Sequence, residues 1–176
     1  MLRKKIPFFI IILLLLGVGI AFCAGHTEQI DGSTIDVCFS SSDYCRGIIL
    51  DAIDSAQEKI DVAVYSFTNL ELSKALIKAH LRGVAVRVIT DNLQSRGRYS
   101  KSQFLADSGI PVRLDDDNGY MHHKFAVFDG KSVIFGSYNW SNSAEDKNDE
   151  NLLFLRDKNV ARDFEDEFER LWQGYK

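Results

Sequence analysis

Strand and helix patterns alternate along residues 34–90, and this alternation limits the possible folds more than any other feature of the chain. Residues 34–39 roughly alternate polar and apolar side chains, and residues 60–65 form a β-rich run, so both predict strands. Apolar residues recur at helical spacing between positions 48 and 56. A second helix then leads to an apolar run at 84–90, which is typical of a strand buried on both faces. This order predicts the start of a parallel α/β fold.

The second helix has recognisable ends, because Thr68 and Glu71 are spaced as a capping box and Gly83 is typical of a helix C-terminus. The remaining chain is expected to add another helix, four strands and a closing helix with one apolar face. These are a helix around Phe104 and Leu105, strands at 112–114, 122–128, 132–138 and 151–155, and a helix carrying Val160, Phe164, Phe168 and Leu171. The 176 residues suit one domain. We therefore expect an α/β fold, a mixed β-sheet flanked by helices, over residues 34–176.

The N-terminus reads as a targeting segment. Arg3, Lys4 and Lys5 precede an uncharged, strongly apolar run that ends at Ala24. Residues 1–24 are therefore expected to be either a signal peptide or an uncleaved N-terminal membrane anchor, and residues 25–33 a polar linker. Both alternatives place the folded domain outside the cytoplasm, whether periplasmic, secreted or held at the membrane by its N-terminus.

Two cysteines of the folded part suit that compartment. Cys38 and Cys45 form an even pair in a chain predicted to be exported, so a disulfide bond is expected, with two free thiols as the alternative. Without three basic leader residues, the formal net charge falls from −4 to −7. Such a domain does not coat nucleic acid through a broad basic face, but an enzyme with a local basic site is compatible with it.

A predicted hairpin gathers polar residues. Asp129-Gly130 lies between two apolar runs and is a strong hairpin signal. If these two residues form the turn, Phe128 pairs with Lys131 and His122 lies opposite Ser137. Alternation along the strands then places four side chains on one face of the ribbon: His122, Lys124, Ser137 and Asn139. One cation, two neutral donors and a nucleophile or acid suit the charged transition state of a phosphodiester.

These residues carry a family resemblance. His122, Lys124 and Asp129 match the HxKxxxxD motif of the phospholipase D superfamily, and the segment Gly136-Ser137-Tyr138-Asn139 is similar to the element that follows it there. Glu150-Asn151 resembles the acidic position of its single-motif bacterial endonucleases. The resemblance runs from about Thr34 to the C-terminus and implies a phospholipase D-like fold.

The resemblance also implies a role for each residue. His122 is the expected nucleophile that forms a phosphohistidine, and Glu150 the carboxylate that orients a histidine ring. Lys124, Ser137 and Asn139 are the expected phosphate ligands. By the parity count Asp129 faces the other way, and its structural role in the turn is at least as well supported as a catalytic one; His123 is expected to be a neighbour on that opposite face.

The chain has one copy of the motif where large members of the superfamily have two. The reaction needs a neutral histidine to attack and a protonated one to donate to the leaving oxygen, so two chains meeting in a homodimer are the simplest complete site. No cofactor and no metal are expected, because Lys124 and its mate can replace a metal's charge.

The expected function is an exported, metal-independent nuclease acting on DNA or RNA. The alternatives are a phospholipase D-type lipid phosphodiesterase and, third, a nucleic-acid-binding module without activity. Arg96, Arg98 and Lys101 form a polar segment that either lines a nucleic-acid groove or is a solvated loop.

Overall fold

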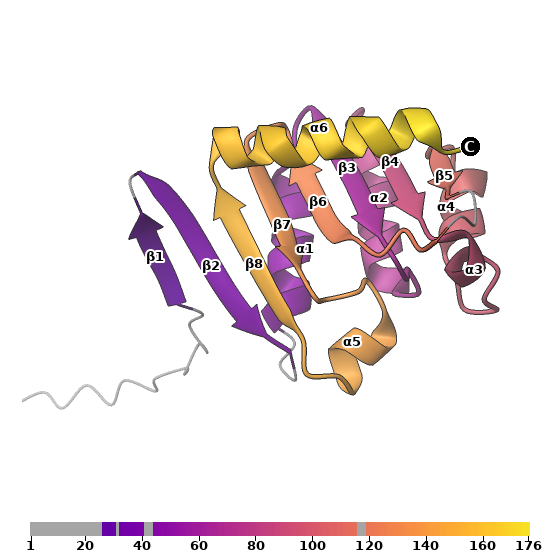
Figure 1. Ribbon diagram of the computed structural model, residues 1–176, viewed down its shortest axis with the longest axis horizontal. Coiled ribbons are helices and arrows are strands. Elements are labelled where there is room, and N and C mark those ends of the chain that lie inside the picture. The colour runs from indigo at the N-terminus through magenta and orange to yellow at the C-terminus, as the bar shows by residue number, and fades with distance from the viewer. Residues whose placement is uncertain (1–25, 31, 41–43, 116–118) are drawn as a thin grey trace, which may run out of the picture.

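A computed structural model describes residues 26–30, 32–40, 44–115 and 119–176 (Figure 1). The predicted leader, residues 1–24, lies outside these ranges. The strands are β1 His26–Ile30, β2 Ser33–Phe39, β3 Lys59–Val64, β4 Ala85–Thr90, β5 Val112–Leu114, β6 Lys124–Phe128, β7 Ser132–Gly136 and β8 Asn151–Arg156. The helices are α1 Tyr44–Ser55, α2 Leu70–Leu81, α3 Asn92–Ser95, α4 Ser102–Asp107, α5 Asn142–Asp146 and α6 Lys158–Gly174.

The described strands form one mixed sheet in the order β1-β2-β8-β7-β6-β3-β4-β5. Strands β3, β4 and β5 are parallel to one another, as expected where helices connect them, whereas the other neighbours pair antiparallel. The predicted α/β fold with a mixed sheet is therefore confirmed. In Figure 1, β3 and β4 end at the lower edge of the sheet, where β6 and β8 begin.

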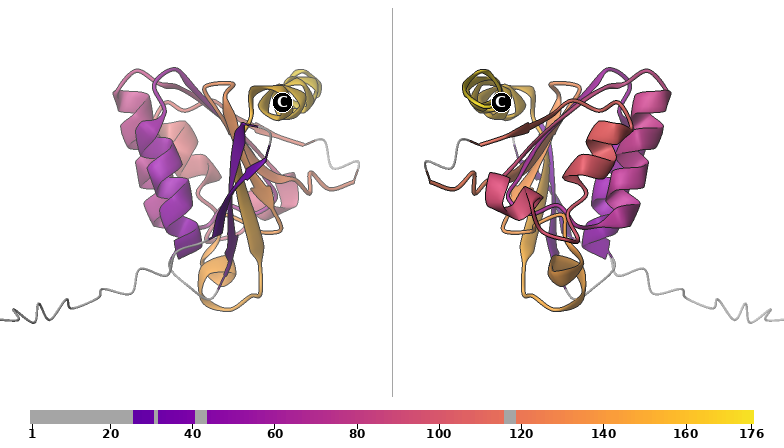
Figure 2. Two further views of the ribbon diagram at one scale, coloured as in Figure 1. Left: turned by 90° about the vertical axis from the view of Figure 1, so that its left-hand side faces the viewer. Right: turned by 90° about the vertical axis from the view of Figure 1, so that its right-hand side faces the viewer.

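Helices cover both faces of the sheet. Figure 2 shows α1 and α2 against one face and α6 against the other. One apolar core lies on the α1 and α2 side and includes Ile49, Leu72 and Val88. A second core lies under α6, where Phe168 packs with Phe125 and Val133. Both cores include residues of the central strands β3, β4 and β6. Close packing on both faces makes these strands a rigid support for the side chains at their ends.

Two local predictions were wrong. Residues 26–30 are not linker but strand β1, which pairs with β2 from His26↔Val37 to Ile30↔Ser33. Their sequence is too polar to signal a strand, and they are strand because β2 offers an unpaired edge. The N-cap of α2 is Asn69 rather than Thr68: its Oδ1 accepts from the backbone N–H groups of Glu71 and Leu72. The Thr68 hydroxyl instead accepts from Asn142 N, 3.3 Å away.

The β6–β7 hairpin differs by one residue from the predicted register. Asp129 and Gly130 have φ of 54° and 61°, and Lys131 N donates to Phe128 O at 2.9 Å, as in a two-residue turn. The ladder nevertheless pairs Phe128 with Ser132, so Lys131 is one extra residue. This odd loop invalidates the parity count that placed His122 opposite Ser137.

A disulfide bond joins Cys38 in β2 to Cys45 in α1, which confirms that prediction. Both cysteines are buried. Beyond Cys38 the chain reaches Ser40, whose hydroxyl donates to Asn148 O at 2.6 Å and accepts from Glu150 N at 2.7 Å. The disulfide thus joins the end of β2 to α1, and the Ser40 hydrogen bonds hold it beside the start of β8. Within the described ranges, every helix is too short or too polar to cross a bilayer.

Candidate active site

His122 lies two residues before β6, a strand that begins at the lower edge of the sheet in Figure 1. Its side chain is exposed, and its ring lies 4.5 Å from the Tyr65 ring, centroid to centroid, at a tilt of 53°. Tyr65 follows the last residue of β3, and its N–H donates to His123 O at 2.8 Å. The β3–β6 pairing therefore places an aromatic ring against the histidine, while the rest of the imidazole faces solvent.

Lys124 also contacts the Tyr65 ring. Its Nζ donates to the carbonyl of His122 at 2.8 Å and lies 4.8 Å from the Tyr65 centroid, a cation–π distance. Burial lowers the pKa of Lys124, and the carboxylates of Glu150 and Asp91 partly oppose that change. A partly desolvated ammonium between carboxylates is well suited to bind an anion, because bound phosphate would favour its charged form.

Ser137 reaches the same edge by a break in strand β7. Gly136 has φ of 151°, and a Cβ there would lie 2.3 Å from Asn151 O, so only glycine fits. Just after it, the N–H groups of Ser137 and Tyr138 both donate to Asn151 O, at 3.1 and 3.3 Å, the pattern of a β-bulge. The bulge ends the strict alternation of β7, which is why Ser137 joins this site although the predicted register was wrong.

Glu150 contacts Ser137 rather than a histidine in this chain. Ser137 Oγ donates to Glu150 Oε2 at 2.5 Å, and Asn148 Nδ2 donates to Glu150 Oε1 at 2.8 Å. The carboxylate also acts electrostatically on Lys124. The implied role of Glu150 in orienting a histidine therefore has no counterpart among the described contacts of a single chain. Within the chain, Glu150 instead positions the hydroxyl of Ser137.

Asn139 completes the group. Its Oδ1 accepts from Ser66 N at 3.2 Å. The side-chain NH2 therefore points away from Ser66 N, and an NH2 group is the donor that a phosphate oxygen requires. Four of the sequence-predicted residues thus gather with Tyr65 at one edge: His122, Lys124, Ser137 and Asn139.

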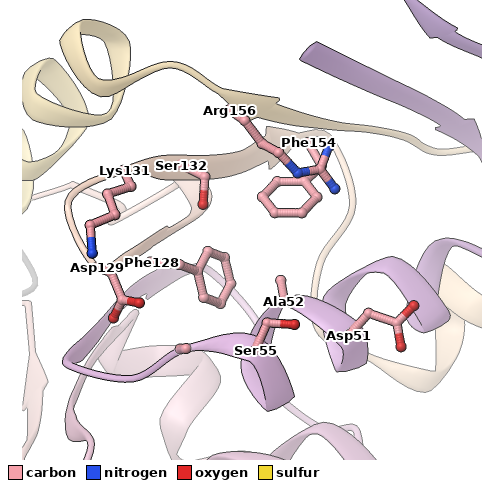
Figure 3. A pocket seen from close by; sticks show the side chains of 10 residues that line it. Asp51, Ala52, Ser55, Phe128, Asp129, Lys131, Ser132, Phe154 and Arg156 are labelled. Carbon is pink, nitrogen blue, oxygen red and sulfur yellow. The ribbon is translucent and has the colours of Figure 1, made fainter. Parts of the chain in front are cut away.

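Asp129 lies at the other end of β6, about 16 Å from Lys124 at the usual rise of a strand. Its carboxylate accepts from the backbone N–H groups of Gln57, Glu58 and Lys59, at 3.1, 2.8 and 2.9 Å. Burial raises the pKa of Asp129, but these three donors outweigh it and hold the pKa below its ordinary value. Figure 3 shows Asp129 and Lys131 at the rim of a separate pocket of about 240 Å³. The geometry is that of a structural residue.

His123 points the other way, toward α6. Its Nε2 lies 3.2 Å from Glu167 Oε1, and its ring packs at 5.3 Å from Phe125. Phe125 belongs to the core under α6. His123 thus contacts α6, as alternation predicted, although it borders one pocket together with His122.

Two contributors were missed from the sequence. Tyr65 contacts both His122 and Lys124, and Gln94 Nε2 donates to the Tyr65 hydroxyl at 3.1 Å. The available signal was an aromatic residue directly after a buried strand. Among the described residues, no group of three or more His, Cys, Asp or Glu side chains is placed to hold a metal ion.

A family profile and two known proteins resemble this chain. A family profile described as "Cardiolipin synthase, PLD-like domain" matches residues 49–172. Mitochondrial cardiolipin hydrolase of Xenopus tropicalis is 44% identical over 120 residues, which are 68% of this chain and 57% of that protein. A phospholipase D of Rickettsia prowazekii is 32% identical over 137 residues, 78% of this chain and 67% of the relative. This chain thus spans less than two thirds of the cardiolipin hydrolase.

Among solved structures, the chain resembles Nuc from Salmonella typhimurium, a phospholipase D family member. The TM-score is 0.78 and the identity 33%, and the match covers 82% of this chain and 97% of the other. The family profile, over residues 49–172, includes every residue of the site described above.

Proposed function

This chain belongs to the phospholipase D-like family of phosphodiester hydrolases, and we propose that it is a metal-independent nuclease whose active site is completed by a second copy of the chain. One observation carries the proposal: the exposed imidazole of His122 lies beside the proposed phosphate ligands Lys124, Ser137 and Asn139. A nucleophile next to one cation and two neutral donors is what attack at a phosphodiester requires.

The chemistry proceeds in two displacements. A neutral His122 nitrogen attacks phosphorus, and the bond from phosphorus to the leaving oxygen breaks as that oxygen takes a proton from a second, protonated histidine. Water then attacks the phosphohistidine, gives its proton back to the second histidine, and releases His122 with the phosphate product. Lys124, Ser137 and Asn139 bind the non-bridging oxygens in both steps, where negative charge grows.

The second histidine is the reason to propose a homodimer. The other described histidines do not face the proposed phosphate ligands: His123 contacts Glu167 of α6, His80 lies on α2 and His26 on the edge strand β1. Two copies related by a two-fold axis through this edge would supply one imidazole each, since an isologous interface brings the same residue from both chains together. Glu150, which bonds to Ser137 within the chain, also has a histidine of the partner as its possible neighbour there.

Nucleic acid is the proposed substrate because aromatic and basic side chains border the nucleophile. The Tyr120 ring is 66% exposed and lies edge-on to Tyr65 at 6.2 Å. Arg96 and Arg98 are exposed in the segment that follows α3, and the Arg98 guanidinium lies 4.7 Å from the Tyr99 ring. Tyrosines for stacking and arginines for phosphates are the usual elements of a single-strand binding groove.

A lipid phosphodiesterase is the second candidate. The curated relatives described above are named for cardiolipin and phospholipid hydrolysis. Phe39, Leu70 and Leu93 are exposed by 72%, 46% and 51%. Phe39 is the last residue of β2, and Leu70 and Leu93 lie in the helices that follow β3 and β4. Exposed apolar residues around a phosphodiester site would suit a bilayer surface.

We also propose that the domain works outside the cytoplasm, because a disulfide such as Cys38–Cys45 persists in an oxidising compartment. The deciding experiment for substrate gives one purified sample single-stranded DNA, RNA, and vesicles of cardiolipin or phosphatidylcholine, with turnover measured for each. Rapid cleavage of a nucleic acid and slow or absent lipid turnover is expected. The reverse ranking would replace the nuclease with the lipid enzyme.

A further inference from the structure

A cavity of about 460 Å³ opens beside the phosphate-binding residues. It shares Tyr65 and Asn139 with the site, so a group bound in the cavity would lie next to a phosphate held by Lys124. Its far wall carries Tyr99, which is 64% exposed, and the amide and hydroxyl of Asn142 and Ser143. The phosphoryl-transfer mechanism proposed above uses none of the residues of this far wall.

The walls of this cavity are firmly held. Thr68 N and Asn69 N donate to Trp140 O at 2.8 and 3.0 Å, which ties the connection between β3 and α2 to the segment after β7. Beneath them, the buried rings of Phe67 and Trp140 pack edge to face at 5.3 Å. The cavity is therefore preformed rather than a gap between independent loops.

Its chemistry is neutral throughout. Among the described residues that line it, two are tyrosines and the others carry amides or hydroxyls, with no charged side chain. A phosphate would call for cations, and an acyl chain for an apolar wall. A flat, uncharged group with several hydrogen-bond donors and acceptors fits both the rings and the amides.

We infer that this cavity is a nucleobase-binding subsite, an inference that rests on the nuclease proposed above and names its substrate as a strand with an unpaired base next to the scissile phosphate. The base would stack on Tyr99 and present its polar edge to side chains such as Asn142, which makes no side-chain hydrogen bond to the described residues. A base held in Watson–Crick pairing cannot offer that edge, so the nucleotide must be single-stranded at this position. Arg98, beside Tyr99, is placed to meet a neighbouring phosphate.

The test compares two short strands of equal length, a thymidine oligonucleotide and one in which tetrahydrofuran residues replace every nucleoside. Both keep the sugar-phosphate chain, and the ratio of their kcat/KM values is the readout. Wild type should favour the thymidine strand by roughly 5- to 100-fold, the usual effect of one stacked base. Tyr99→Ala should bring the ratio close to one, and Asn142→Ala should lower it in the same direction.

Phe104→Ala is the matched control, because Phe104 is an exposed aromatic residue on the nearby α4 that does not line the cavity. It should keep the wild-type ratio. Equal cleavage of both strands by wild type, or an unchanged ratio in Tyr99→Ala, would overturn the base subsite and leave the nuclease intact. Failure of wild type to cleave either strand, together with failure on the DNA and RNA of the substrate comparison above, would overturn the nuclease and, with it, the subsite.

Discussion

Replacing Asp129 separates the stability of the motif from its chemistry. In Asp129→Ala, three backbone N–H groups lose a carboxylate acceptor, and the residue at φ 54° loses a side chain that tolerates this conformation. Two of the three donors are near solvent, so about 2 kcal/mol is expected from the lost hydrogen bonds. The left-handed backbone adds about 1 kcal/mol. The free energy of unfolding should therefore fall by about 3 kcal/mol.

Asp129→Asn is the matched control, because asparagine also adopts positive φ and keeps one oxygen acceptor. The free energy of unfolding of Asp129→Asn should be about 1 kcal/mol lower than that of wild type. Urea unfolding without reductant, followed by the fluorescence of the buried Trp140, gives both values. Activity per folded molecule should stay within about twofold of wild type in both variants, because Asp129 lies at the far end of β6.

The contribution of Asp129 to the free energy of unfolding should decrease in acid. Since the folded-state pKa of Asp129 lies below its ordinary value of 3.8, its stabilising effect is fully present above about pH 5 and is lost as the pH falls through the folded-state pKa. The difference in unfolding free energy between wild type and Asp129→Asn should therefore shrink in acid. A large loss of activity in the asparagine variant at unchanged stability would refute the structural reading of this residue.

Four further outcomes are expected. His122→Ala should abolish turnover, whereas His123→Ala, on the α6 side, should keep most of it; equal losses in steady-state kinetics would contradict the site. Activity should survive excess EDTA, and loss on chelation with recovery in Mg²⁺ would exclude the metal-free mechanism. When wild type and His122→Ala are refolded together, specific activity should follow the square of the wild-type fraction, while a straight line would exclude a shared site. Mass spectrometry without reductant should show Cys38 linked to Cys45, and Cys38→Ser with Cys45→Ser should cost about 2–3 kcal/mol, measured by urea unfolding.

The fold was predictable where the pattern is local. Helical spacing around Ile49 and Ile53, and the apolar runs of β3 and β4, identify the elements, because each buries its own apolar face. Strand β1 was not predictable, since its five residues are strand only by pairing with β2. The N-cap was misplaced by one residue because Thr68 and Asn69 are both good capping residues, and a tertiary contact to Asn142 decides between them.

That these residues lie close together was predictable, but the geometry that brings them together was not. His122, Lys124, Ser137 and Asn139 were identified from spacing, but a two-residue turn and the observed loop share the same Asp-Gly signature. Only the bulge after Gly136 returns Ser137 to the group. The Tyr65 contact depends on β3 lying beside β6, a neighbour relation that no local pattern contains.

The extra residue Lys131 and the bulge after Gly136 have a consequence for how this protein can change in evolution. Deleting Lys131 alone would leave a two-residue turn with Phe128 still opposite Ser132, so both faces of β7 would be kept. A single insertion or deletion between Ser132 and Gly136 would instead exchange the faces of the β7 residues beyond it, and apolar side chains such as Val133 and Ile134 would no longer match their own cores. A lineage can thus lose the turn residue Lys131 on its own, whereas one that gains or loses a residue within β7 keeps its activity only with a second, compensating change.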